Sequence, residues 1–243
     1  TMVEGYSAYW NYEDNMKFMK EMITYILEKL YDGNLNIQIG DKVIDFGGEW
    51  KVVSFRELIL KDCGIDIDKF ETAESLLAEI RNQKIELDAE NIESLGRGNL
   101  IDQLYKKVSR PSIIEPTFLI KHPIDLSPLA RSNDENPKIT DRFQLIVNGQ
   151  EIINGYSELV DAREQERRLI KQSELKAQGD EEAMSIDKEY IRAMEYGMPP
   201  ISGWGLGVDR FLQFLTSSQN IRDVVLYPLM RPRDWANESD DEE

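Results

Sequence analysis

Three strand-like runs in the second half of the chain constrain its fold more than any other feature. They cover residues 116–121, 142–148 and 150–160, and the last two meet at Asn148-Gly149, a dipeptide typical of tight hairpin turns. A hairpin joins antiparallel neighbours, whereas parallel strands need a long crossover between them. Because the runs follow no regular strand–helix–strand rhythm, the sequence predicts an antiparallel sheet flanked by helices, an α+β fold.

Helical patterns surround these runs. Apolar residues recur at helical spacing in four stretches, residues 13–31, 100–108, 161–178 and 187–196. Between the first two stretches, Gly40-Asp41 separates two β-branched runs that predict a hairpin, and Ser54 to Glu57 form a capping-box pattern that predicts a helix start. We expect one domain over residues 1–235, with residues 33–95 as a peripheral, largely helical insertion.

Charge and hydropathy exclude several classes of partner. The formal net charge of -17 argues against a nucleic-acid grip spread over the surface, so any contact with RNA must be local and DNA is not expected. No apolar run approaches the roughly 18 residues that suggest a membrane span, so a membrane is not expected either. Much of the acidity of the C-terminal end lies in residues 236–243, which we predict to be a disordered tail.

Cysteine and histidine each occur once. A single cysteine excludes an internal disulfide and a four-thiolate zinc site, which fits a reducing, cytoplasmic compartment. We interpret Cys63 as a small buried hydrophobe. Any Ser-His-Asp chemistry would have to use His122, which ends an apolar run just before Pro123, and we do not expect that role.

The segment from Gly203 to Arg210 predicts a polyphosphate site. Gly203, Gly205 and Gly207 precede an apolar helical pattern, and we expect a turn that leads into a helix. Glycines let the backbone approach a ligand, a helix start favours anions, and the Arg210 guanidinium can clamp phosphate oxygens. The same pattern can be a packing device alone, and it is neither a dinucleotide fingerprint nor a Walker motif.

Polar residues also run through the strand expected at residues 150–160. Two-residue alternation puts Asn154, Tyr156 and Glu158 on one face and Glu151 on the other. Buried polar groups are costly unless they are paired, so we predict that these four face a ligand, with a bulge between Glu151 and Asn154. A solvated edge strand is the alternative.

A third polar group lies near the start of the chain. If residues 1–9 are extended, Glu4 and Tyr6 point to one side. Carboxylates together with an aromatic hydroxyl make a suitable cage for an ammonium group.

Together these segments resemble the class II aminoacyl-tRNA synthetases that handle aspartate, asparagine and lysine, and within them the lysyl-tRNA synthetases. The likeness runs from Thr1 to about Pro232 and is close in four blocks, residues 1–12, 116–131, 140–161 and 199–232. It implies ATP-dependent formation of lysyl-adenylate from L-lysine and transfer of the lysyl group to tRNA(Lys). It also implies Mg²⁺, a homodimer at full length and a cytoplasmic location.

The resemblance implies roles for named residues. Glu4, Tyr6 and Glu158 would hold the lysine ε-ammonium, and the rest of the amino-acid pocket would be Asn154, Tyr156 and Gly205. On the nucleotide side, Glu151 would bind the metal that bridges ATP phosphates, Gly207 would let ATP approach the backbone, and Arg210, the catalytic residue, would contact the γ-phosphate.

Departures from the family pattern qualify this interpretation. A carboxylate that shares the metal in the family is replaced by Gln144, a weaker ligand for Mg²⁺, and Trp204 is bulkier than expected and would reshape the pocket wall. In the family, the anticodon-binding barrel, motif 1 and the motif 2 arginine precede the position of Thr1. We therefore expect a fragment that is inactive by itself.

Three functions stay open. The chain could be part of a lysine–tRNA ligase, part of a lysyl-transferring protein-modification enzyme or amide-forming relative on the same fold, or a non-catalytic regulatory module. The segments Ser127 to Arg131 and Ile221 to Pro228 fit the tRNA ligase better.

Overall fold

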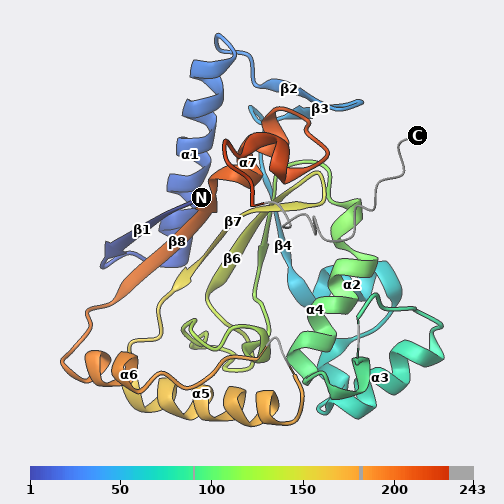
Figure 1. Ribbon diagram of the computed structural model, residues 1–243, viewed down its shortest axis with the longest axis vertical. Coiled ribbons are helices and arrows are strands. Elements are labelled where there is room, and N and C mark those ends of the chain that lie inside the picture. Colours follow the sequence, from blue (N-terminus) through green and yellow to red (C-terminus); the bar gives the residue numbers. More distant parts are fainter. Residues whose placement is uncertain (90, 181–182, 230–243) are drawn as a thin grey trace, which may run out of the picture.

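A six-stranded sheet forms the centre of the structure (Figure 1). The structure is a computed structural model that describes residues 1–89, 91–180 and 183–229. In spatial order its strands are β1 (Met2–Ala8), β8 (Ile201–Gly207), β7 (Gln150–Ser157), β6 (Arg142–Val147), β5 (Thr117–Ile120) and β4 (Lys51–Ser54). Every neighbouring pair is antiparallel except β4 and β5. The predicted α+β fold is confirmed, and its one parallel pair follows from the long helical connection between those two strands.

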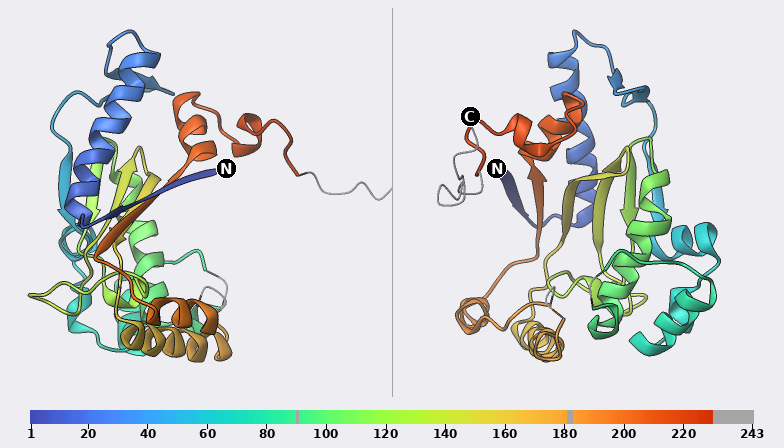
Figure 2. Two further views of the ribbon diagram at one scale, coloured as in Figure 1. Left: turned by 90° about the vertical axis from the view of Figure 1, so that its left-hand side faces the viewer. Right: turned by 45° about the vertical axis from the view of Figure 1, so that its right-hand side comes forward.

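One face of the sheet is covered by α1 (Tyr12–Leu30), which lies on the opposite side from α7 (Val208–Leu215) in the edge-on view of Figure 2. The α1 helix begins at Asn11, whose side chain accepts hydrogen bonds from the backbone of Glu13 and Asp14. Its buried stripe joins apolar residues of β6, β7 and β8, and the hairpin of β2 (Asn36–Ile39) and β3 (Lys42–Asp45) extends this core. The predicted first helix and hairpin are confirmed.

A second core lies between the β4–β6 side of the sheet and three helices. These are α2 (Phe55–Cys63), α3 (Ala73–Asn82) and α4 (Arg97–Val108), and they pack around Leu119 of β5 and Ile146 of β6. The expected helix start after Ser54 is found, but the Ser54 side chain makes no capping hydrogen bond. The range predicted as peripheral, residues 33–95, includes β4, which belongs to the main sheet.

Two further helices, α5 (Ala162–Ala177) and α6 (Lys188–Glu195), pack together beyond one end of the sheet (Figure 1). Short 3-10 turns complete the secondary structure at Ile67–Lys69 (η1), Ile92–Ser94 (η2), Arg110–Ser112 (η3), Ile124–Leu126 (η4) and Ile221–Val224 (η5). In residues 1–89, 91–180 and 183–229, no helix has the length and apolar character needed to cross a membrane. The acidic tail predicted at residues 236–243 lies outside the described residues.

The glycine-rich segment differs from the expectation. Residues 203–207 were predicted as a turn, but they belong to β8, which pairs with β1 on one side and β7 on the other. A β-carbon on Gly203 would lie 2.6 Å from the Tyr6 ring and 2.7 Å from Glu158 Oε1. Glycine is therefore needed here because the side chain of Tyr6 on β1 and that of Glu158, just after β7, occupy this space. The helix starts only at Val208.

Candidate active site

A cavity of about 410 Å³ lies over β1, β7, β8 and the start of α7. Nine of the ten residues that the sequence marked as a site line it: Glu4, Tyr6, Glu151, Asn154, Tyr156, Glu158, Gly205, Gly207 and Arg210. The tenth, Gln144, lies outside the lining residues. Segments at opposite ends of the chain thus form one site, with a volume typical of small-molecule pockets.

Strand register explains how these residues meet. Glu4 of β1 lies opposite Gly205 of β8, which in turn lies opposite Asn154 of β7. Laterally paired residues point to the same face of a sheet. Because the middle strand carries a glycine in this row, side chains from the two outer strands can approach the same ligand above it.

The predicted bulge in β7 is confirmed. Ile153 pairs with Leu145 and Glu151 pairs with Ile146, so Ile152 is the extra residue between them. Such a residue reverses the alternation of side chains across the sheet. Glu151 therefore lines the same cavity as Asn154 despite the odd spacing in sequence.

Carboxylates dominate one end of the cavity. Glu158 is only 7% exposed, and burial, together with the charge of Glu4, raises its pKa to about 7. The Tyr6 hydroxyl donates to Glu4 Oε2 at 3.3 Å, and burial followed by the charge of Glu4 raises the pKa of Tyr6. Within the described part of the chain, no hydrogen bond or cation satisfies the Glu158 carboxylate. This end can bind an ammonium group, whose charge would stabilise both carboxylates.

The other end combines an arginine with a helix start. Arg210 lies in the first turn of α7, its Nη1 donates to the Glu151 carbonyl at 3.0 Å, and the same nitrogen lies 3.8 Å from Glu151 Oε1. The Arg210 side chain is about half exposed. Since it retains free donors toward solvent and adjoins the positive end of the α7 dipole, this end suits a polyphosphate.

Glu151, Gln144 and His122 form a chain of side-chain hydrogen bonds. The buried Gln144 donates through Nε2 to Glu151 Oε2 at 2.7 Å, while its Oε1 lies 3.2 Å from His122 Nε2. Burial, followed by the charge of Arg142, lowers the pKa of His122 well below its ordinary value, so the ring is neutral and donates from Nε2. Gln144 therefore turns its NH₂ group, not its oxygen, toward Glu151.

This arrangement leaves Glu151 as the one carboxylate of the described site that is placed for a metal. Across residues 1–89, 91–180 and 183–229, no group of three or more His, Cys, Asp or Glu side chains could hold an ion. Magnesium commonly takes one or two protein carboxylates and completes its shell with phosphates and water. The donor set thus fits one Mg²⁺ bound mainly through a nucleotide.

Comparison with known proteins agrees with this geometry. The family model described as "tRNA synthetases class II (D, K and N)" matches residues 1–231. The chain belongs to this family. It is similar to the lysine–tRNA ligases of Thermosipho africanus (40% identical), Fervidobacterium nodosum (43%) and Aquifex aeolicus (40%), over 98%, 96% and 96% of this chain and 46%, 44% and 38% of those relatives. The chain therefore spans less than half the length of these relatives.

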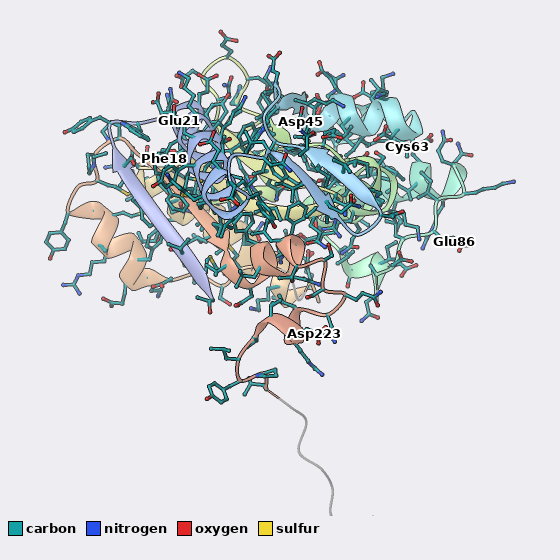
Figure 3. The ribbon with its side chains drawn as sticks, turned by 90° about the horizontal axis from the view of Figure 1, so that it is seen from above. Phe18, Glu21, Asp45, Cys63, Glu86 and Asp223 are labelled. Atoms are coloured by element: carbon teal, nitrogen blue, oxygen red, sulfur yellow. The ribbon has the colours of Figure 1, made fainter. Side chains whose placement is uncertain are left out.

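Trp204 does not have the role that the sequence predicted for it, which was to reshape the pocket wall of the synthetase site. It is among the residues that line the cavity, but its ring packs 6.0 Å from the ring of Phe18 on α1 and also covers Gly5. Figure 3 labels Phe18 on α1 beside β1. The indole thus lies on the face opposite Gly203 and Gly205, where it fills the core and does not replace a side chain of the ligand face.

Sequence reasoning missed two residues that contact the lining residues of the synthetase site from its sides. Arg142 of β6 contacts Asn154, and the charge of Glu158 reaches Tyr190 of α6, whose pKa is raised by burial and then by Glu158. The signal available for Arg142 was its place in a hairpin with Asn148-Gly149, because that register puts it opposite Tyr156. No local pattern marks Tyr190.

Proposed function

We propose that this chain provides the lysine-activating part of a lysine–tRNA ligase. The observation that carries the proposal is the ammonium end of the cavity, where Glu4 and Glu158 lie with the Tyr6 hydroxyl and no cation of the described chain neutralises them. Glu158 directly follows the 8-residue β7 strand, whereas Glu151, which contacts Arg210, lies near the start of that strand. An amino acid with a cationic side chain can then place its carboxylate between the carboxylate cage and the polyphosphate.

The reaction that fits this layout is adenylate formation. The lysine carboxylate oxygen attacks the α-phosphorus of ATP, the bond to the bridging oxygen breaks, and pyrophosphate leaves. Glu4 and Glu158 fix the ε-ammonium, Asn154 and Tyr156 line the middle of the pocket, and Arg210 holds phosphate oxygens. Catalysis of this kind depends on alignment of the reactants and on charge stabilisation, so no nucleophilic side chain is needed.

The metal belongs to the same proposal. Glu151 would hold one Mg²⁺, which would screen the charge of the ATP phosphates, and the amide of Gln144 would orient Glu151 without binding the ion. The second step, transfer of the lysyl group to the 3′-terminal ribose of tRNA(Lys), the homodimer and the cytoplasmic location are further parts of the proposal, supported by the family and by the named relatives. A single catalytic domain over residues 1–235 is also part of the proposal.

Amino-acid-dependent ATP–pyrophosphate exchange tests the proposal. It is measured on the polypeptide that carries residues 1–243, with each of the common amino acids and with ornithine. We expect exchange with lysine far above that with arginine or ornithine. Absence of lysine-dependent exchange, with ATP and lysine both bound in calorimetry, would instead support the regulatory module. Offering tRNA(Lys) and protein acceptors to the preformed adenylate then separates a tRNA ligase from a protein-modifying relative.

A further inference from the structure

Arg142 of β6 lies beside the cavity, on the same face of the sheet as Tyr156, and contacts one of the lining residues. Its Nε donates to Asn154 Oδ1 at 2.9 Å, and its Nη1 donates to the Leu126 carbonyl at 2.8 Å and to Ser127 Oγ at 2.9 Å. The Asn154 contact is diagonal, because Arg142 pairs with Tyr156 across the two strands. The arginine is therefore fixed at one end by the η4 turn and at the other by the pocket.

This contact sets the orientation of the Asn154 side chain. A carboxamide has one acceptor oxygen and one donor NH₂ group, which point in different directions. Because Arg142 can only donate, it holds Oδ1 and leaves Nδ2 as the group available on the cavity side. Among the described residues Nδ2 has no acceptor, so a ligand can supply one.

The charge of Arg142 favours an anionic acceptor. All three of its hydrogen-bond acceptors are neutral oxygens, and the charges of Glu151 and Asp102 reach it only through space. Burial lowers the pKa of Arg142, but a guanidinium stays protonated in proteins. A cation beside the middle of the pocket, with an amide donor between it and the ligand, matches a carboxylate.

Position along the strands identifies which carboxylate. Along β7, Asn154 lies between Glu151 at the phosphate end and Glu158, which directly follows the strand, at the ammonium end. A bound amino acid whose side-chain ammonium reaches Glu158 has its α-carboxylate on the phosphate side of that contact. We propose that Arg142 is a positioning residue that locks the Asn154 carboxamide so that Nδ2 donates to the α-carboxylate of the amino acid that is activated. The inference rests on the proposed function, since it assumes an amino-acid substrate in this cavity.

Cadaverine (1,5-diaminopentane) separates this role from a structural one, because it is lysine without the carboxylate. The measurement is the affinity of the polypeptide that carries this chain for lysine and for cadaverine, by calorimetry. In the Arg142→Met variant we expect lysine affinity to fall about tenfold, the usual effect of losing a hydrogen bond to a charged group, while cadaverine affinity stays within about twofold. Equal losses for both ligands, or no loss for either, would overturn the inference.

A matched control comes from Arg168, which also donates to a backbone carbonyl, that of Ala130, and to a serine hydroxyl, that of Ser132. It contacts none of the pocket residues that we assign to lysine. Arg168→Met should lower thermal stability but leave the ratio of lysine to cadaverine affinity unchanged. A shift of the ratio in this control equal to that in Arg142→Met would show that any lost arginine has the effect.

Asn154→Asp tests the donor itself and keeps the inference testable where Arg142→Met fails to fold. The aspartate keeps an acceptor for Arg142 but has no NH₂ group, so we expect lysine affinity to fall about tenfold or more with little change for cadaverine. An unchanged ratio in this variant would refute the role of Nδ2. If the unsubstituted protein binds neither ligand, the proposed function fails and the inference falls with it, whereas normal lysine binding with unchanged ratios in the variants removes the inference alone.

Discussion

Two cavities of this molecule differ in how their charges are satisfied. The larger, of about 720 Å³, lies between the helices α3 and α4 and the helix α5, and its charged groups have partners: Arg97 binds Asp125, Arg81 binds Glu93, and Asp180 accepts from the Gly96 amide. The smaller, of about 410 Å³, holds Glu158 with no partner in the described chain.

The size of a cavity therefore does not identify the functional site of this molecule. A buried, uncompensated carboxylate costs free energy of folding, and a chain retains it where a ligand compensates it. Arg97, in contrast, donates to the carbonyls of Ile67 and Phe70 as well as to Asp125, so it joins the η1 turn to α4 and η4. We therefore interpret the larger cavity as a structural junction and the smaller one as the place of chemistry.

The largest effect is expected from removal of the charge that the smaller cavity leaves unpaired. Glu158→Gln keeps the shape of the side chain but cannot bind an ammonium group as an ion. Breaking a buried charge pair costs about 4 kcal/mol, so kcat/KM for lysine in pyrophosphate exchange should fall nearly a thousandfold. Glu166→Gln on the exposed side of α5 is the control. A loss below about tenfold would contradict the assignment of Glu158 to the ammonium.

The same substitution should stabilise the protein without ligand. The pKa of Glu158 is about 7 in the folded chain against an ordinary 4.5, so the folded state holds its proton more tightly. Stability therefore falls as pH rises from about 4.5 to about 7, and Glu158→Gln should avoid this loss of about 3 kcal/mol. Urea denaturation at pH 4 and pH 8 measures it. The variant and the wild type should have the same free energy of unfolding at pH 4. Equal stability at pH 8 would show that the charge of Glu158 does not destabilise the folded protein.

Arg97→Met tests the larger cavity. It leaves two carbonyls without their donor and leaves Asp125 with Lys171 alone, so we expect a loss of about 2 kcal/mol of stability. Because these groups serve packing, KM for lysine and for ATP should stay within about twofold at a temperature where the variant is folded. A tenfold change in either KM would break the comparison between the two cavities.

Much of the fold and of the smaller cavity could be predicted from the sequence, and the rest could not for physical reasons. Hairpin signals and two-residue alternation placed Asn154, Tyr156 and Glu158 on one face, and the bulge near Ile152 followed from the need to bring Glu151 to the same ligand. The turn predicted at residues 203–207 was wrong, because glycine clusters resemble turns when the neighbours that fill their space are unknown. The second cavity and Tyr190 depend on contacts between elements that are distant in sequence, which no local pattern reports.

The smallest effect is expected at Gln144, the neutral side chain that contacts Glu151 just outside the lining of the smaller cavity. Gln144→Glu puts a second carboxylate next to Glu151, and like charges at this distance raise the pKa of both until a cation binds. We expect the Mg²⁺ concentration for half-maximal exchange to fall about fivefold, near 1 kcal/mol, because a second carboxylate favours the ion. Thermal melting with and without Mg²⁺ gives an independent readout, in which the variant should gain more from the ion than the wild type. Gln38→Glu on the exposed β2 strand controls for net charge. If the variant shows no greater dependence on Mg²⁺, then the neighbouring His122 has balanced the new carboxylate by taking a proton, and Gln144 orients Glu151 for a reason other than the metal.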